Sequence, residues 1–265
     1  MTTQTPEWLT QHGDRNAPAT EILRTVVGSG VHGIAIDGQD DADEMGVYVE
    51  SLEQVFGIAH IDHHYVARTV PEGHRSRPGD VDLVLYSLRR FIALAATGNP
   101  TALLPLFAPP SDVLHCTLLG AELRAFGPSL LSQQAGWRFL GFARSQHQRL
   151  LGQDRRHIPN RPELVAAHGY DTKYASHAVR LIMQGIEVVE SGRLTLPLHQ
   201  GARDTVLAIK RGERELPYVL ELLDSGERRL TELLERGQSP LPEKPDLAAT
   251  NRWLRDAHLS YWNLR

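Results

Sequence analysis

The first part of the chain alternates short apolar or β-branched runs with polar turns, a pattern that is typical of strands. Three such runs stand out, at residues 24–27, 46–50 and 81–86. The stretch 57–79 between the last two runs is polar and rich in histidine, glycine and proline, which predicts mostly loop. We therefore expect three strands, with a long loop before the third.

From Ser87 onward the apolar positions change to the period of a helix. Residues 88–95 carry one apolar face, and Gly98 ends that helix. Asn99 and Pro100 then have the order of an N-cap and a first helical residue, which predicts a second helix through residue 106. After residue 110 every periodic segment predicts a helix, at residues 111–126, 132–153, 161–191, 202–211, 215–236 and 246–258.

A strand-rich first part and an all-helical second part together predict an α+β fold. We place the boundary near residue 110. Residues 1–110 would then form a small mixed β-sheet flanked by helices, and residues 111–265 would form an all-helical domain. A chain of 265 residues is long enough to give each part a hydrophobic core.

The composition favours a cytoplasmic protein. The formal net charge is −4, whereas a protein that coats long nucleic acid through its overall field is usually basic, so any nucleic-acid contact must be local. The one cysteine, Cys116, lies in an apolar stretch, so we expect a small buried side chain and no intrachain disulfide. No apolar run approaches the roughly 18 residues of a membrane span, and the first residues lack the pattern of a secretory signal.

Residues 28–33, Gly-Ser-Gly-Val-His-Gly, satisfy the G-x-G-x-x-G pattern of dinucleotide-binding folds. That site needs a helix directly after the turn to hold the pyrophosphate, whereas residues 34–40 predict a short strand and a turn. The acidic cluster at residues 40–44 would also repel a pyrophosphate. A calcium loop that starts at Asp41 fails as well, because its twelfth position is Leu52 and not a glutamate. We therefore expect neither site.

The spacing of Asp41 and Asp43 suits a divalent cation. Residues two apart on an extended segment project from the same face, and two neighbouring carboxylates repel each other unless a cation such as Mg²⁺ or Mn²⁺ lies between them. Just upstream, Gly28 and Ser29 offer backbone N–H groups and a hydroxyl that suit a phosphate. The spacing alone leaves a solvated acidic hairpin as the alternative.

Asp82 lies within an otherwise apolar predicted strand, where an unpaired carboxylate is costly to bury. A metal shared with Asp41 and Asp43 would offset that cost. Three carboxylates, two metal ions and a triphosphate together make a phosphoryl-transfer site. Asp80 has the same strand parity as Asp82 and is the alternative third carboxylate.

These motifs resemble those of a known superfamily. The Gly-Ser turn followed by Asp41-Ala42-Asp43 looks like the signature of the DNA polymerase β-like nucleotidyltransferases. Three further stretches resemble the RNA-ligase-associated branch of that superfamily, a group of predicted nucleotidyltransferases: residues 82–100, 139–146 and 168–192. The resemblance implies a polymerase β-like fold and a Mg²⁺- or Mn²⁺-dependent transfer from a nucleoside triphosphate, with the three carboxylates as metal ligands.

The resemblance also implies a phosphate-binding group in the helical part. Lys173 would contact the triphosphate, and Arg180 would either assist it or anchor the domains. Both residues lie with His177 on one face of a predicted helix, at spacings i, i+4 and i+7. The pattern alone leaves open an exposed polar helix face with Asp171 as its N-cap.

A run of arginines precedes this helix, comprising Arg138, Arg144, Arg149, Arg155, Arg156 and Arg161. Such a run is usually a solvated face, although it would also guide a polyanionic acceptor. Arg144 lies inside the matched stretch Phe-Ala-Arg-Ser-Gln. The resemblance assigns it to the nucleotide-binding residues, together with Tyr170, Gly28 and Ser29.

The sequence therefore predicts an enzyme that transfers a nucleotide to an acceptor hydroxyl and releases pyrophosphate. The acceptor is an RNA 3′ end, a protein hydroxyl or a small molecule, and the sequence does not distinguish these three. The alternative from another class is a non-catalytic nucleotide sensor on the same fold. A sensor would have no need for all three carboxylates, which favours the enzyme.

Overall fold

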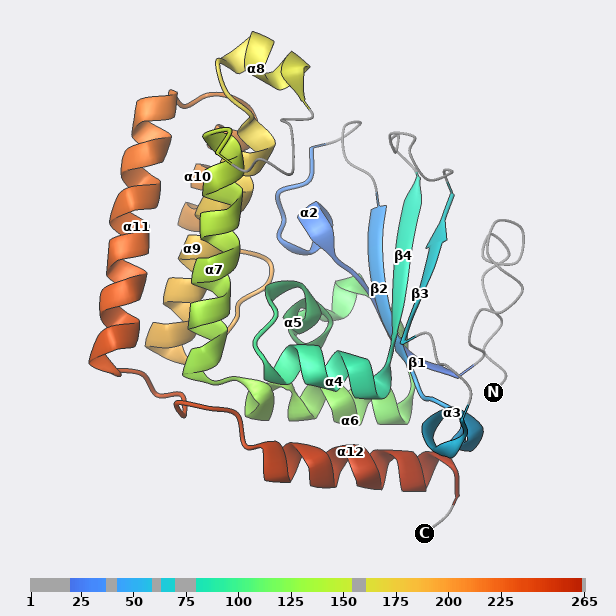
Figure 1. The fold of residues 1–265 in the computed structure, drawn as a ribbon. Helices are drawn as coiled ribbons and strands as arrows, with labels where there is room; N and C mark the ends of the chain where they lie inside the picture. Colours follow the sequence, from blue (N-terminus) through green and yellow to red (C-terminus); the bar gives the residue numbers. More distant parts are fainter. Residues whose placement is uncertain (1–19, 37–41, 59–62, 70–79, 154–160, 264–265) are drawn as a thin grey trace. The chain divides into compact units, whose positions relative to one another are not determined.

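The computed structural model describes residues 20–36, 42–58, 63–69, 80–153 and 161–263 (Figure 1). It confirms the α+β fold, in which a five-stranded mixed sheet with helices is followed by a helical region. The chain divides into two compact units. The sheet unit comprises residues 1–96, 101–130 and 246–265, and the helical unit comprises residues 97–100 and 131–245. The domain boundary near residue 110 stays a prediction.

The sheet has the strand order β3-β4-β2-β1-β5. Its strands are β1 (Glu21–Val26), β2 (Ala42–Tyr48), β3 (His64–Arg68), β4 (Val81–Ser87) and β5 (Val113–Cys116). β2 and β4 run parallel, and the other neighbours run antiparallel. β1, β2 and β4 coincide with the three apolar runs of the sequence. Since β2 is the central strand, its side chains have neighbouring strands on both sides.

β3 lies within the segment that was predicted as loop, so this part of the prediction was wrong. Of its five residues only Ala67 is buried, and the apolar alternation that marks a strand is therefore weak. β3 forms because it pairs with β4 from His64 opposite Tyr86 to Arg68 opposite Asp82. Pairing with a strand that comes later in the chain cannot be seen in a local sequence pattern.

β5 lies at the start of the segment 111–126, which was predicted as one helix. The helix α6 (Leu118–Phe126) begins only after Thr117, whose side chain accepts a hydrogen bond from the backbone of Gly120. The prediction that Cys116 is buried was also wrong, because its side chain is exposed. Alternation along this edge strand turns Cys116 away from the better-covered face.

The helices of the sheet unit are α2 (Gly28–Val31), α3 (Leu52–Phe56), α4 (Leu88–Ala96), α5 (Pro100–Phe107), α6 and α12 (Leu247–Tyr261). The first residue of α5 belongs to the helical unit. The sheet unit also has 3₁₀ turns at Pro110–Asp112 and Gly127–Leu130. α4 buries the apolar face that the sequence predicts. α12, the last helix described, packs beside α4 (Figure 1). Its Trp253 stacks on Phe126 of α6, with ring centroids 5.1 Å apart.

The helical unit consists of α7 (Gln133–Leu150), α8 (Pro162–His168), α9 (Thr172–Ser191), α10 (Gln200–Lys210) and α11 (Leu216–Arg236). α9 is the central helix and packs against α7, α10 and α11. Glycine permits this close approach, because a Cβ atom on Gly185 of α9 would lie 2.9 Å from Cβ of Phe139 on α7. None of the helices in the described part of the chain is both long and apolar enough to cross a bilayer.

The single helix predicted over residues 161–191 is divided into α8 and α9. Gly169, at φ +81°, ends α8 in the left-handed conformation that favours glycine. Asp171 then caps α9, because its side chain accepts hydrogen bonds from the backbone N–H groups of Lys173 and Tyr174. The break fixes Lys173 in the first turn of α9.

Candidate functional site

Asp43 and Asp82 lie side by side on the sheet. Asp43 is the second residue of β2, Asp82 is the second residue of β4, and the two are direct register partners in the parallel pair. Register partners project from the same face of a sheet. The structure therefore brings together two of the three carboxylates that the sequence singled out. The side chain of Asp82 is 29% exposed, which leaves this position open to a ligand.

The glycine turn lies directly against the first of these carboxylates. The backbone N–H of Val27 donates to the carbonyl oxygen of Asp43 over 2.8 Å. Gly28 has φ +62°, and a Cβ atom on it would lie 2.0 Å from Oδ2 of Asp43. Only glycine fits here, both in conformation and in space. The turn that carries Ser29 and the carboxylate of Asp43 are thus parts of one site.

The geometry of the turn also excludes the dinucleotide interpretation. The turn itself contains α2, a helix of four residues that the sequence did not predict, and no longer helix follows it before β2 in the described residues. The next strand, β2, pairs with β1 antiparallel. A dinucleotide-binding unit needs a longer helix and a second strand that runs parallel to the first.

Arg68 is a charged neighbour of this site that the sequence pattern missed. It lies on β3 opposite Asp82, and its Nε is 3.7 Å from Oδ1 of that aspartate. The position would have been found only if β3 had been recognised as a strand. Arg68 offsets part of the negative charge of the two carboxylates. Its side chain is 44% exposed, so the contact is weak enough to rearrange when a ligand binds.

Asp80, the alternative third carboxylate, has a different environment. It precedes β4, and its Oδ1 accepts a hydrogen bond of 3.3 Å from the hydroxyl of Thr69. Its carbonyl oxygen accepts a hydrogen bond from the backbone of Ala42. These contacts fasten the starts of β2 and β4, whereas Asp82 is the residue in register with Asp43. The geometry supports Asp82 as the third carboxylate.

Asp41 lies outside the described residues, immediately before the start of β2. Among the described residues, no three carboxylate, histidine or cysteine side chains gather closely enough to hold a metal ion. Asp43 and Asp82 supply a pair, and Asp41 would supply the third ligand. Carboxylate oxygens are the ligands that Mg²⁺ and Mn²⁺ prefer, so the donor set fits either ion.

The neighbouring acidic residue, Glu44, has a structural role. Strand alternation turns it to the opposite face of the sheet, where Arg24 lies buried. Arg24 makes a bidentate contact with Glu21, in which Nε and Nη2 lie 2.7 and 2.5 Å from Oε1 and Oε2. Its Nη1 lies 3.5 Å from Oε2 of Glu44. Burial raises the pKa of Glu44, although the charge of Arg24 counteracts part of this effect. Glu44 therefore belongs to a buried ion-pair network and not to the metal site.

The helical unit contains a cluster of positive charge around His177. Lys173, His177 and Arg180 follow one another along α9, with Lys173 exposed and Arg180 buried. The pKa of His177 is lowered to about 3. The largest cause is burial, followed by the charges of Arg180, Lys173, Arg149 and Arg161 in that order. His177 is therefore neutral at pH 7. We call these five residues the cationic cluster, and such a cluster attracts anions.

Arg180 is the most unusual member of the cationic cluster. It is only 9% exposed, and its Nη1 donates to Oε1 of Gln184 over 2.6 Å. Burial lowers the pKa of Arg180 to about 9, and no carboxylate pairs with it in the described part of the chain. Buried charges in proteins are normally paired. A buried arginine without an acidic partner favours an anionic ligand.

Two other predicted nucleotide-binding residues are engaged within the helical unit. The hydroxyl of Tyr170 donates to the carbonyl oxygen of Arg214 over 2.7 Å, and burial raises the pKa of this phenol. Nε of Arg144 lies 3.1 Å from Oε2 of Glu227 on α11, and its Nη2 donates to Thr231. Both contacts hold helices or loops together. A nucleotide-binding role for Tyr170 and Arg144 stays a prediction.

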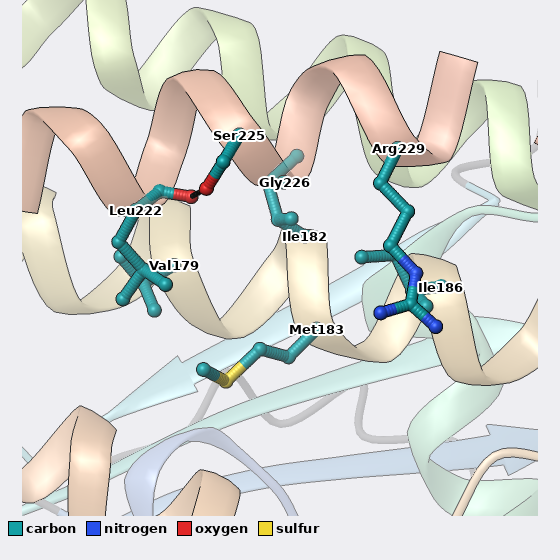
Figure 2. Close-up of a pocket in the computed structure, with 8 residues that line it drawn as sticks. All are labelled: Val179, Ile182, Met183, Ile186, Leu222, Ser225, Gly226 and Arg229. Atoms are coloured by element: carbon teal, nitrogen blue, oxygen red, sulfur yellow. Dashed lines mark hydrogen bonds between the residues drawn. The ribbon is translucent and has the colours of Figure 1, made fainter. Parts of the chain in front are cut away.

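A hollow of about 410 Å³ lies between α9 and α11 (Figure 2). Its lining is mostly apolar, with Ile182 and Met183 of α9 facing Leu222 of α11. The two polar side chains at its edge are already engaged. Ser225 donates to the carbonyl of Leu222, and Arg229 pairs with Glu190 over 2.6 Å. This hollow therefore offers no free group for chemistry.

Comparison with known protein families identifies one whose model matches most of the chain. The model of the RNA repair pathway DNA polymerase beta family, RlaP, matches residues 5–256. Among solved structures, the chain is similar to a nucleotidyltransferase-like protein from Exiguobacterium sibiricum, with 10% sequence identity and a TM-score of 0.28. That match covers 92% of this chain and 72% of the other. None of the curated proteins matches the chain.

Proposed function

Because the chain belongs to the RNA repair pathway DNA polymerase beta family, we propose that it transfers a nucleotide from a nucleoside triphosphate to the 3′ hydroxyl of an RNA. The predicted membership of the polymerase β-like nucleotidyltransferases is confirmed by that family match. The observation that carries the proposed activity is the register pairing of Asp43 with Asp82 beside the close contact of Gly28. A pair of aligned carboxylates against a glycine turn suits a triphosphate and its metal ions.

The residues have distinct roles in this reaction. Asp41, Asp43 and Asp82 would hold two Mg²⁺ or Mn²⁺ ions, which supply Lewis-acid stabilisation of the phosphates and of the acceptor oxygen. The backbone N–H groups after Gly28 and the hydroxyl of Ser29 bind the terminal phosphates. Within the helical unit, Lys173 and Arg180 would supply the positive charge that the family resemblance assigns to triphosphate binding. Arg68 offsets part of the negative charge at Asp82 until the ligand binds.

The proposed transfer is a single in-line displacement. The acceptor hydroxyl oxygen forms a bond to the α-phosphorus while the bond from that phosphorus to the bridging oxygen breaks. Asp82 accepts the hydroxyl proton, and pyrophosphate leaves with both electrons of the broken bond. The protein contributes positioning and electrostatic stabilisation, which supply most of the rate enhancement in such reactions.

The test is nucleotide transfer with each α-labelled triphosphate, Mg²⁺ and an RNA that ends in a 3′ hydroxyl. Asp43→Asn and Asp82→Asn should lose at least about 10³-fold of the rate while they keep the fold, because each removes a predicted metal ligand. Glu122→Gln is the matched control, since it neutralises an exposed carboxylate on α6 of the same unit.

The acceptor is identified by comparison with an RNA whose 3′ end is blocked. Label that moves to the blocked RNA, to a protein or to a small molecule would overturn the RNA 3′ end as acceptor but keep the transferase. Binding of triphosphate and Mg²⁺ without any pyrophosphate release would indicate a nucleotide sensor. Full activity in both aspartate variants would overturn the proposed site.

A further inference from the structure

Helix α7 has an unusual charge composition. Its 18 residues, Gln133–Leu150, include three arginines and a histidine but no aspartate or glutamate. Its buried side packs on α9 with small and apolar residues, among them Ala135, Phe139 and Ala143. The basic residues therefore lie on the sides of α7 that do not pack on α9.

The two remaining sides of α7 carry its basic residues. On one side, Arg144 and His147 both approach Glu227 of α11, at 3.1 and 3.0 Å. The other side carries Arg138, Phe142 and Arg149, spaced i, i+4 and i+11, which places them in one row along the helix. We call this row the α7 stripe.

The α7 stripe combines positive charge with an exposed aromatic ring. Phe142 is 36% exposed, although it is an apolar side chain on a helix whose other face already supplies the packing. Arg138, one turn before it, is exposed and forms no ion pair or side-chain hydrogen bond within the described part of the chain. An exposed phenylalanine beside an unpaired arginine is a combination that fits a planar, anionic partner.

The α7 stripe leads to the cationic cluster. α7 packs along α9, and Arg149, the last member of the stripe, is one of the charges that lower the pKa of His177 on α9. Lys173 and Arg161 lie in the same cluster. Positive potential therefore continues from Arg138 along α7 into the proposed phosphate-binding group, within the helical unit alone.

We propose that the α7 stripe binds the single-stranded RNA acceptor, with a base stacked on Phe142 and phosphates bound by Arg138 and Arg149. Single-stranded nucleic acid fits because its bases are free to stack on an aromatic ring, whereas those of a duplex are not. The overall charge of −4 restricts binding to such a local surface. The inference rests on the proposed function for the role of this RNA as acceptor, and its test measures binding.

The test is the dissociation constant of a fluorescently labelled 12-nucleotide single-stranded RNA, measured by anisotropy on the full chain at several salt concentrations. Phe142→Ala should weaken binding about tenfold at all salt concentrations, because it removes a stacking surface. Arg138→Gln should weaken binding and reduce the slope of log affinity against log salt by about 1, because it removes a phosphate contact. Arg138 is exposed, so Arg138→Gln should keep the melting temperature of the parent, whereas Phe142, 36% exposed, packs in part, so Phe142→Ala should lower the melting temperature slightly and keep the fold.

Two variants on α11 are the matched controls, and neither should change the RNA affinity. Tyr218→Ala removes another exposed aromatic ring, 44% exposed, and Arg228→Gln removes an exposed arginine. An RNA affinity that is unchanged by Phe142→Ala and Arg138→Gln, or equal binding to a duplex or an acidic peptide, would overturn the α7 stripe. If the protein binds RNA through the α7 stripe but transfers no nucleotide, the proposed function would be overturned and the α7 stripe would stand.

Discussion

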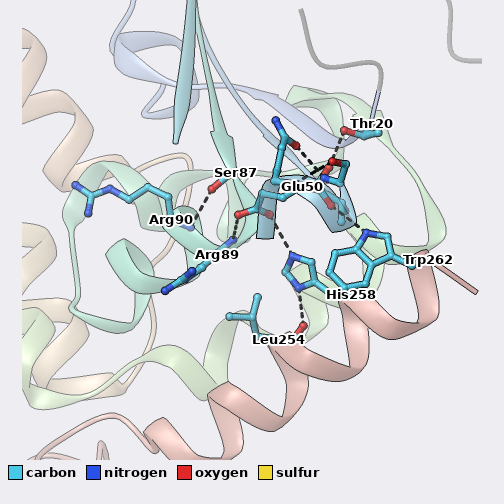
Figure 3. A network of polar contacts seen from close by, with 11 residues as sticks. Thr20, Glu50, Ser87, Arg89, Arg90, Leu254, His258 and Trp262 are labelled. Atoms are coloured by element: carbon cyan, nitrogen blue, oxygen red, sulfur yellow. Dashed lines mark hydrogen bonds and ion pairs between the residues drawn. The ribbon is translucent and has the colours of Figure 1, made fainter. Parts of the chain in front are cut away.

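Glu50 and His258 lie 208 residues apart in the sequence and form a buried ion pair in the sheet unit (Figure 3). Oε2 of Glu50 lies 3.1 Å from Nε2 of His258, and Nδ1 of His258 lies 2.8 Å from the carbonyl oxygen of Leu254. Both ring nitrogens face acceptors, an arrangement that favours the doubly protonated, charged imidazole. Trp262 adds a hydrogen bond of 3.0 Å to the carbonyl of Glu50, so the end of the chain is fastened beside α4.

The ion pair makes the stability of the sheet unit depend on pH. Burial alone would lower the pKa of His258, but the hydrogen bonds to Glu50 and Leu254 outweigh it and raise the pKa. Burial alone would raise the pKa of Glu50, but hydrogen bonds from His258 and Ser87 outweigh it and lower the pKa. The stabilisation is therefore greatest between about pH 4.5 and 6.5, the ordinary pKa values of the two groups.

We expect His258→Gln to lower the free energy of unfolding by about 3 kcal/mol near pH 6, because it leaves Glu50 buried without a cation. The difference from the parent should shrink as the pH rises through the raised pKa of His258, and also as the pH falls through the lowered pKa of Glu50. Urea unfolding at a series of pH values measures both limbs. A difference that stays constant from pH 5 to 9 would show that the imidazole is neutral in the fold.

Gly28→Ala should abolish nucleotide transfer. The added Cβ atom would lie 2.0 Å from Oδ2 of Asp43, so either the turn or the carboxylate must move. Gly237→Ala is the control, because Gly237 has nearly the same φ, +61°, and an added Cβ atom there meets nothing within 4 Å. Both variants should lose about 1 kcal/mol of stability from the left-handed backbone, but only Gly28→Ala should lose activity. Equal activity in the two variants would show that the glycine turn is not part of the active site.

The sequence predicts those parts of the molecule whose signal is local. The long helices α7, α9 and α11 have a clear apolar period, and the Asp41-Ala42-Asp43 motif carries its own spacing. The edge strands β3 and β5 were missed because pairing with a distant strand, not their own composition, forms them. The Glu50–His258 pair could not be predicted for the same physical reason, since nothing near either residue marks its partner.

Arg180→Met should separate ligand binding from stability. Since Arg180 is buried without an acidic partner, its desolvation cost is not offset, and its loss should lower the free energy of unfolding by no more than about 2 kcal/mol, the cost of leaving the buried Oε1 of Gln184 without its donor. The increase in melting temperature produced by inorganic triphosphate should fall markedly. Arg193→Met, which removes an exposed arginine of the same unit, should affect neither quantity. A loss of several kcal/mol with an unchanged response to triphosphate would make Arg180 a purely structural residue.

Arg24 presents the opposite case, a buried cation with acidic partners. It is 6% exposed and is held by Glu21 and, more weakly, by Glu44. Arg24→Met would leave two buried carboxylates without a counter-charge, which should cost about 3–5 kcal/mol of stability at pH 7.5. Adding Glu21→Gln to that variant should restore part of the loss, because it removes one of the two charges.

The pH dependence of Arg24→Met gives a second readout of this arrangement. Without the guanidinium, burial raises the pKa of Glu44 further, so the folded state takes up a proton that the unfolded chain does not hold near neutral pH. Stability of the variant relative to the parent should therefore increase as the pH falls from 7.5 to 5. Urea unfolding at the two pH values measures this change. If the relative stability stayed constant or decreased, Glu44 would be hydrated in the variant, and the network would be a surface feature.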